Sequence, residues 1–125
     1  MSYNGDVTIH VQRAEFLKDN DLFGKMDPYL KISCGTNEFK TKVAKNKGKA
    51  PDWNETFTFS VMGEQNVKIE AYDSDSAGSD DLLGTDSISL ARAFLHGSDM
   101  EPKKLYDKKG NSVGQVFLKI TFQRR

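Results

Sequence analysis

The chain has 125 residues, a length typical of one domain with one hydrophobic core. It carries 18 basic and 18 acidic side chains, so its formal net charge is zero and no global field favours nucleic acid. No apolar run approaches the roughly 18 residues of a membrane span, and the polar first residues predict no signal segment. The one cysteine, Cys34, excludes an internal disulfide and is typical of a reducing compartment. We therefore expect a cytoplasmic domain that binds no nucleic acid.

Alternation of apolar and polar residues predicts strands along most of the chain. Residues 7–12 are apolar at odd positions, and residues 29–34 place Leu30, Ile32 and Cys34 on one face. Only residues 91–95 favour a helix, of one short turn. Further strands are expected over residues 38–43, 51–61, 67–72, 85–90, 105–106 and 116–122.

Seven or eight short strands with almost no helical period predict an all-β fold, an antiparallel β-sandwich. Neither a repeat nor a linker interrupts the chain, so we expect one domain over residues 1–125, with its core at about 6–123. Loops of a sandwich gather at its two ends, and alternate connections lie at the same end.

Two loops are rich in aspartate. The first, residues 19–28, contains Asp21 and Asp27, and the second, residues 73–84, contains Asp73, Asp75 and Asp81. Clustered carboxylates repel one another, whereas Ca²⁺ is bound by six to eight oxygens supplied mostly by carboxylates and carbonyls. Any single aspartate is an ordinary turn residue. If the fold brings the two loops together, five aspartates could hold more than one calcium ion.

Lysines separate the two acidic loops. If residues 29–34 and 38–43 form a hairpin, Lys31 shares one outer surface with Lys40 and Lys42. The connection at residues 44–50 contains further lysines and no apolar period. A solvated loop and a binding role are both open for it.

Three motifs in chain order carry a resemblance to the C2 domain family, including the small single-C2 proteins of plants of the elicitor-responsive type. Residues 17–31, with the segment Met26-Asp27-Pro28-Tyr29, resemble its first calcium loop, although methionine replaces the usual serine. Residues 51–59, around Trp53-Asn54-Glu55, resemble its Trp-Asn-Glu strand. Asp73-Ser74-Asp75 followed by Asp81-Leu82-Leu83-Gly84 resembles its third loop.

The resemblance implies an eight-stranded antiparallel sandwich of the C2 fold, in the permuted topology similar to that of phospholipase C. It implies a Ca²⁺ cofactor held by a set of aspartates, and calcium-dependent recruitment of a monomer to anionic phospholipid membranes containing phosphatidylserine or phosphoinositides. The aspartates at ligand positions are Asp21, Asp27, Asp73, Asp75 and Asp81. Asp80 matches no ligand position.

The contact with lipid is expected from other residues. Leu22 and Phe23 are the large apolar pair of the loop tips and are the expected membrane contact; the alternative is that they pack at the loop base. Lys31, Lys40 and Lys42 resemble the phosphoinositide patch of some C2 domains, and each lysine near an anionic surface contributes about 1 kcal/mol.

The acidic motif has two rival interpretations. An EF-hand fits Asp73, Asp75 and Gly78, but Gly84 stands where the loop needs glutamate, and the flanks are strands. A haloacid-dehalogenase type of enzyme needs alternating helices, and no nucleophile pairs with His10 or His96. We expect no enzyme. A protein-interaction adaptor that uses the sandwich without lipid stays open.

Overall fold

A computed structural model describes residues 3–17 and 25–125. Within these ranges the chain is made mostly of strands, as predicted, with one short helix. The elements are β1 (Asn4–Phe16), β2 (Pro28–Cys34), β3 (Asn37–Lys40), β4 (Asp52–Met62), β5 (Asn66–Asp73), β6 (Asp81–Ser89), α1 (Ala91–His96), β7 (Ser98–Asp99), β8 (Lys103–Tyr106) and β9 (Ser112–Arg124).

The strands form two antiparallel layers, β3-β2-β5-β6 and β8-β9-β1-β4. A single bridge between Thr85 and Tyr106 joins the layers, through β6 and β8. Eight strands follow this path, and the two-residue β7 pairs with β9 beside it. The all-β antiparallel sandwich is therefore confirmed. The phospholipase C-like permutation stays a prediction.

The core lies between the layers and follows the predicted alternation. On the central strand β1, Val7, Ile9 and Val11 have no exposed surface, while His10 points outward and accepts or donates a 2.9 Å hydrogen bond with Thr56 on β4. Cys34 is 3% exposed, so it is a core residue as expected. Burial of these side chains supplies the main driving force for folding.

Aromatic rings close one side of the sandwich, where the end strands β3 and β4 are not paired with each other. Phe39 of β3 lies 5.3 Å from the ring centroid of Phe57 and 5.8 Å from that of Phe59, both on β4. Phe57 and Trp53 remain half-buried for this reason, although the sequence places them on the core face. Trp53 is held by its indole N–H, which donates to the Pro28 carbonyl at 3.3 Å.

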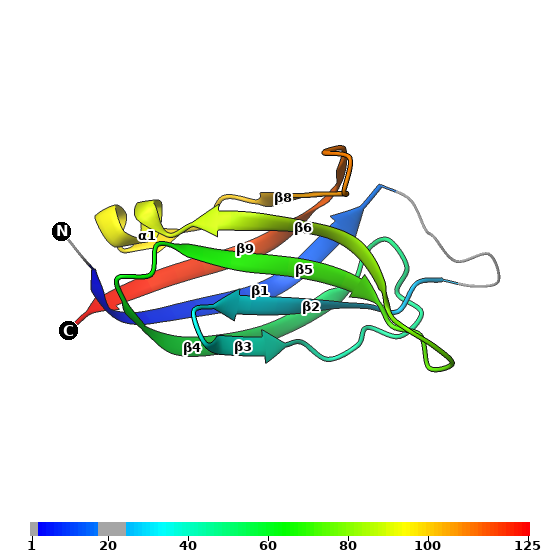
Figure 1. Cartoon of the computed structure of the whole chain (residues 1–125), viewed down its shortest axis with the longest axis horizontal. Coiled ribbons are helices and arrows are strands. Elements are labelled where there is room, and N and C mark those ends of the chain that lie inside the picture. The colour runs from blue at the N-terminus through cyan, green and yellow to red at the C-terminus, as the bar shows by residue number, and fades with distance from the viewer. Residues whose placement is uncertain (1–2, 18–24) are drawn as a thin grey trace.

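The loops separate into two ends. The connections at residues 41–51, 74–80 and 107–111 all lie at one end, on the right in Figure 1. We call this the loop end. The start of β1, the end of β9 and α1 lie at the opposite end. The topology thus brings residues 25–27 and 74–80 to the same end, as the alternation of connections in a sandwich requires.

Candidate functional site

Three of the predicted ligands lie at or beside the ends of neighbouring strands at the loop end. Asp27 directly precedes β2, Asp73 ends β5, and Asp81 begins β6. In the sheet register Pro28 is opposite Asp73, and Asp73 is opposite Asp81. Asp75 follows in the connecting loop and is exposed. Asp21 lies outside the described residues.

Two hydrogen bonds join Asp27 to residues 73 and 74. The Asp27 N–H donates to Asp73 Oδ1 at 2.9 Å, and the Ser74 N–H donates to the Asp27 carbonyl at 3.0 Å. Asp73 is 5% exposed, so this carboxylate is anchored at the base of the site. Charge-assisted hydrogen bonds of this kind are stronger than neutral ones. The described end of the first acidic loop, at Asp27, is thus joined to the start of the second by one side-chain and one backbone acceptor.

Asp80 has a structural role that no sequence motif suggests. It lies in the connection between β5 and β6 and accepts the Tyr29 hydroxyl on Oδ2 at 2.5 Å and the Asp75 N–H on Oδ1 at 2.9 Å. These two donors lower the pKa of Asp80. Burial, followed by the bond to Asp80, raises the pKa of Tyr29 to about 12, so the hydroxyl remains a donor at neutral pH. Asp80 therefore holds the loop instead of offering free oxygens.

The ring of Tyr29, whose hydroxyl makes the hydrogen bond to Asp80, stacks on a second tyrosine. The rings of Tyr29 on β2 and Tyr72 on β5 are 5.4 Å apart between centroids and nearly parallel. The Tyr72 hydroxyl donates to Glu70 at 3.0 Å, within its own strand, whereas Tyr29 reaches the loop. The pair forms the outer surface of the sheet just below the acidic loop.

The lysine-rich connection, residues 41–51, packs against the same site. The Asn46 N–H donates to Asp27 Oδ1 at 2.7 Å, and Asn46 adopts a left-handed φ of 56° to reach it. The Gly48 N–H donates to the Met26 carbonyl at 3.0 Å. Lys45 and Asp27 line one hollow of about 240 Å³ between this connection and Ser74. The sequence allowed either a solvated loop or a binding role for this segment. It lies beside the acidic site because it connects β3 to β4 at the loop end (Figure 1).

Met26 is the residue at which the sequence departs from the C2 motif that it resembles. It occupies the position of the usual serine and has no exposed surface. Its side chain belongs to the hydrophobic core cluster directly below Asp27. The methionine therefore contributes packing beneath the site where the family has a small polar residue.

The donor set suits a hard, oxygen-binding cation. All the predicted ligands are aspartates, and Ca²⁺ binds carboxylate oxygens. Asp73 and Asp27 each accept a backbone N–H through Oδ1, and so does Asp75, from Ala77 at 2.8 Å. Among the described residues, however, no group of three or more His, Cys, Asp or Glu side chains has converged as a metal site. The residue types and their placement at neighbouring strand ends are those that Ca²⁺ sites use, but the described carboxylates do not share one centre.

The predicted basic patch is only partly free. Lys31 and Lys40 are opposite each other in the β2–β3 register, which confirms a shared outer surface. Lys31 forms a 2.6 Å ion pair with Glu38, whose hydrogen bond raises the pKa of Lys31. Lys40 is exposed and its ammonium lies 6.0 Å from the centre of the Tyr29 ring. Lys42 follows the end of β3, so it belongs to the connection instead of the strand.

The expected membrane residues Leu22 and Phe23 lie outside the described part of the chain. Three other apolar side chains are exposed around the loop end: Leu17 at 69%, and Val43 and Leu82 at 37% each. In the described ranges no helix is long and apolar enough to cross a bilayer.

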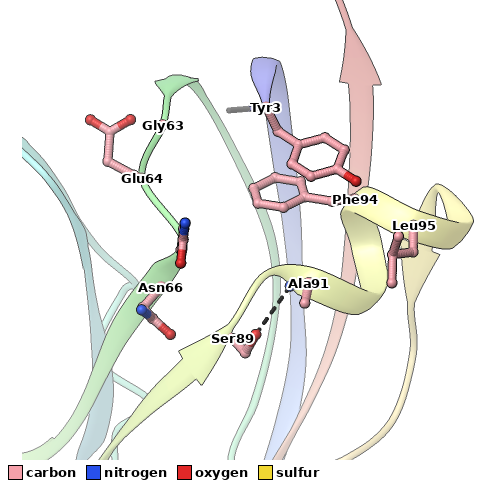
Figure 2. A pocket seen from close by; sticks show the side chains of 9 residues that line it. Tyr3, Gly63, Glu64, Asn66, Ser89, Ala91, Phe94 and Leu95 are labelled. Carbon is pink, nitrogen blue, oxygen red and sulfur yellow. Dashed lines mark hydrogen bonds between the residues drawn. The ribbon is translucent and has the colours of Figure 1, made fainter. Parts of the chain in front are cut away.

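A separate cavity of about 270 Å³ lies at the opposite end, beside α1 (Figure 2). Its walls include Tyr3 and Phe94, whose stacked rings are 4.6 Å apart, and Ser89, which accepts the Ala91 N–H at 3.1 Å. Of the predicted site residues whose positions the structure describes, none lines this cavity. The acidic site and this cavity are therefore independent.

Comparison with known proteins connects this geometry to a family. The family model described as the C2 domain matches residues 5–118. Elicitor-responsive protein 3 of Oryza sativa subsp. japonica is 36% identical over 121 residues, which cover 94% of this chain and 83% of that protein.

Solved structures agree with the sequence relatives. A C2 domain-containing protein from a putative elicitor-responsive gene is 31% identical, with a TM-score of 0.82 over 98% of this chain and 91% of that one. A calcium-bound pair of C2 domains from extended synaptotagmin 2 is 28% identical, with a TM-score of 0.82 over 94% of this chain and 45% of that one. The chain belongs to the C2 domain family.

Proposed function

We propose that this protein is a binding module, and not an enzyme, that attaches to anionic phospholipid membranes in a calcium-dependent manner. The ligands would be Asp21, Asp27, Asp73, Asp75 and Asp81. The observation that carries the proposal is the register at the loop end, in which Asp73 is opposite both Asp81 and Pro28, the residue directly after Asp27. The similarity to a calcium-bound pair of C2 domains supports it.

Without a cation, the loop end would repel an anionic bilayer. Asp75 and Asp81 are exposed there, and Asp73 lies just beneath them. Like charges at this density oppose one another and also oppose the negative surface potential of a cytoplasmic leaflet. Bound Ca²⁺ supplies the compensating charge and open coordination positions for lipid phosphate. The proposed switch is therefore electrostatic.

The chain's own residues prepare that switch. The hydrogen bond from the Asp27 N–H to the Asp73 carboxylate sets the spacing of the ligands at the strand ends. The hydrogen bond from the Asp75 N–H to Asp80 fixes the start of the loop that carries Asp75. A site held in place before binding loses less conformational freedom when a ligand arrives. We propose Leu22 and Phe23 as the residues that enter the lipid interface.

Sedimentation with phosphatidylserine vesicles tests the main proposal. The wild-type protein should pellet with vesicles in calcium and stay in solution in a chelator, while the Asp73→Asn/Asp75→Asn variant should stay in solution in both. The matched control is Asp6→Asn/Asp86→Asn, which removes two carboxylates away from the loop end and should bind like the wild type. Binding that does not respond to calcium, or no binding by any form, would show that the mechanism is wrong.

A basic surface beside the calcium site would add lipid preference. Lys40 and Lys42 are exposed, whereas Glu38 offsets Lys31, so the first two should contribute most. Lys40→Ala/Lys42→Ala should weaken binding to phosphoinositide vesicles more than to phosphatidylserine vesicles. An equal loss on both would remove any phosphoinositide preference.

The second candidate is a protein-interaction adaptor. One observation favours it: the carboxylates of the described residues have not converged into a metal site. A calcium titration followed by thermal unfolding separates the candidates, because a ligand that binds only the folded state raises the melting temperature. A clear rise supports the calcium site, and no rise at millimolar calcium supports the adaptor.

A further inference from the structure

A second basic element lies at the loop end, on the turn between β8 and β9. Residues 107–111 form this turn, and Figure 1 shows it above β6 in the right half of the view, the side on which the acidic loop lies. Its exposed lysines are Lys108 and Lys109. No sequence motif predicts a role for this polar segment.

The turn is rigid because its acidic residue is used internally. Asp107 Oδ1 accepts the N–H groups of Lys109 and Asn111, each at 2.9 Å, and the Asp107 N–H donates to the Asn111 carbonyl. The bond from the Asn111 N–H contributes most to lowering the pKa of Asp107. Gly110 closes the turn at a φ of +85°, a conformation that favours glycine.

Neither lysine forms an ion pair in the described part of the chain, although the charge of Lys109 helps to lower the pKa of Asp107. In the ranges that the structure describes, no carboxylate lies within 4.0 Å of either one, whereas Lys31 and Lys103 both have such partners. Charged lysines that are not paired in the fold are free to contact an anion without breaking an internal bond.

An exposed apolar side chain lies near these lysines. A hollow of about 370 Å³ is lined by Lys108, Lys109 and Leu82, together with Leu83, Gly84, Asp107 and Asn111. Leu82 is 37% exposed and directly follows Asp81. Leu17 is 69% exposed, and its N–H donates to the Val113 carbonyl just after the turn, at 2.9 Å. Basic groups above exposed apolar groups match the order of phosphate and hydrocarbon in a lipid surface.

We propose that the turn at residues 107–111, together with Leu82, is a second contact with an anionic phospholipid surface. Lys108 and Lys109 bind lipid phosphates, and Leu82 enters the interface beside them. The charge complementarity and the direct continuity with Asp81 favour a membrane over a soluble partner. This inference rests on the proposed calcium-dependent binding and deepens it.

The test is the Lys108→Ala/Lys109→Ala variant, measured by sedimentation with phosphatidylserine vesicles at saturating calcium. Two lysines at about 1 kcal/mol each near an anionic surface predict a loss of affinity of about 30-fold, and about 5-fold if only one of them contacts lipid. The loss should shrink at high salt, since screening weakens exposed charges. The turn's hydrogen bonds use backbone groups of Lys109, so the variant should fold and keep the calcium-induced rise in melting temperature.

The matched control, Lys68→Ala/Lys119→Ala, removes two positive charges from strands β5 and β9 away from this turn. A larger loss in the turn variant than in this control supports the inference. Equal losses in the two variants overturn it and leave the proposed function intact. If the wild-type protein itself does not bind vesicles in calcium, the proposed function and this inference fail together. Leu82→Asn, which leaves all charges in place, should weaken binding to phosphatidylserine vesicles in calcium by a factor that high salt does not reduce; no change would remove Leu82 from the contact.

Discussion

The hydrogen bond from Tyr29 to Asp80 ties β2 to the acidic loop, and its removal is the most direct test of how the site is held. The perturbation is Tyr29→Phe, which deletes one hydroxyl and keeps the ring that stacks on Tyr72. We expect lower stability and weaker calcium binding together, because the same bond supports the sheet and positions the loop that carries Asp75.

The size of the effect follows from the burial of the two partners. Tyr29→Phe removes the donor, so Asp80 is the partner that loses a hydrogen bond, and because Asp80 is exposed its carboxylate regains water. A hydrogen bond to a charged group contributes up to about 3 kcal/mol, and with one partner at the surface we expect about 1 kcal/mol. For a chain of this length that lowers the melting temperature by about 4 °C. If the loop loses all of this support, calcium affinity falls by at most about five-fold.

The effect should depend on pH. The pKa of Asp80 is lowered in the folded protein, so its contribution is complete above the ordinary carboxyl range and is lost as pH falls through the folded value, below about 4. The pKa of Tyr29 is raised to about 12, so its contribution is complete below about pH 10 and declines toward pH 12. The stability difference between wild type and Tyr29→Phe should therefore be flat near neutrality and shrink at both extremes.

Urea unfolding and a calcium titration of the same samples provide the assay. The matched control is Tyr72→Phe, which removes the bond to Glu70 within β5 and does not touch the loop. It should lower stability by a similar amount and leave calcium affinity unchanged. If both variants change calcium affinity equally, or if Tyr29→Phe costs no stability, the hydrogen bond from Tyr29 to Asp80 does not hold the loop.

Three further predictions concern the frame around the site. Gly84→Val should cost about 2 to 3 kcal/mol in urea unfolding, because a Cβ at this position would lie 2.5 Å from Val113 and 3.1 Å from Leu105; a neutral result would show that β6 moves freely there. Met26→Ser should cost about 2 to 4 kcal/mol, since it leaves a cavity and a hydroxyl where a fully buried side chain packs; restoring the family's serine without loss would contradict the packing role. Asp99 is 3% exposed and forms a 2.6 Å ion pair with Lys103; burial raises the pKa of Asp99, but the bonds from Lys103 and the Glu101 N–H lower it overall. The stability it contributes is therefore complete above about pH 4 and lost as pH falls, and Asp99→Asn should be less sensitive to acid than the wild type below that pH.

Much of the fold was predictable because alternation records which side of a strand is buried. The apolar positions of β1 and β9 pack in the core as expected, and Cys34 and the helical turn at residues 91–95 were also predicted. The end strands were less predictable. Phe57 and Trp53 stay half-buried because the sandwich is open between β3 and β4, and no local pattern shows where a sheet ends.

The site was predictable in its residue types and less so in its contacts. The spacing of the aspartates and the rule that alternate loops share an end were enough to expect that the two acidic loops meet. The approach of the lysine connection to Asp27 was not expected, because residues 41–51 carry no periodic signal. The pairing of Lys31 with Glu38 was missed for a related reason, since a lysine-rich face does not show which acids share it.

The sequence by itself determined the secondary structure, the core-facing positions and the concentration of carboxylates in two loops, all properties of residues close together in the chain. The tertiary structure decided which carboxylates are available. Asp80 is next to Asp81 in sequence, but it is committed to Tyr29, 51 residues earlier in the chain. Tertiary structure also placed Lys108 and Lys109 beside Leu82, through the joining of β6 to β8 and the return of β9. Such contacts depend on how distant segments are brought together, because a hydrogen bond or a shared surface is set by distance in space and not by spacing along the chain.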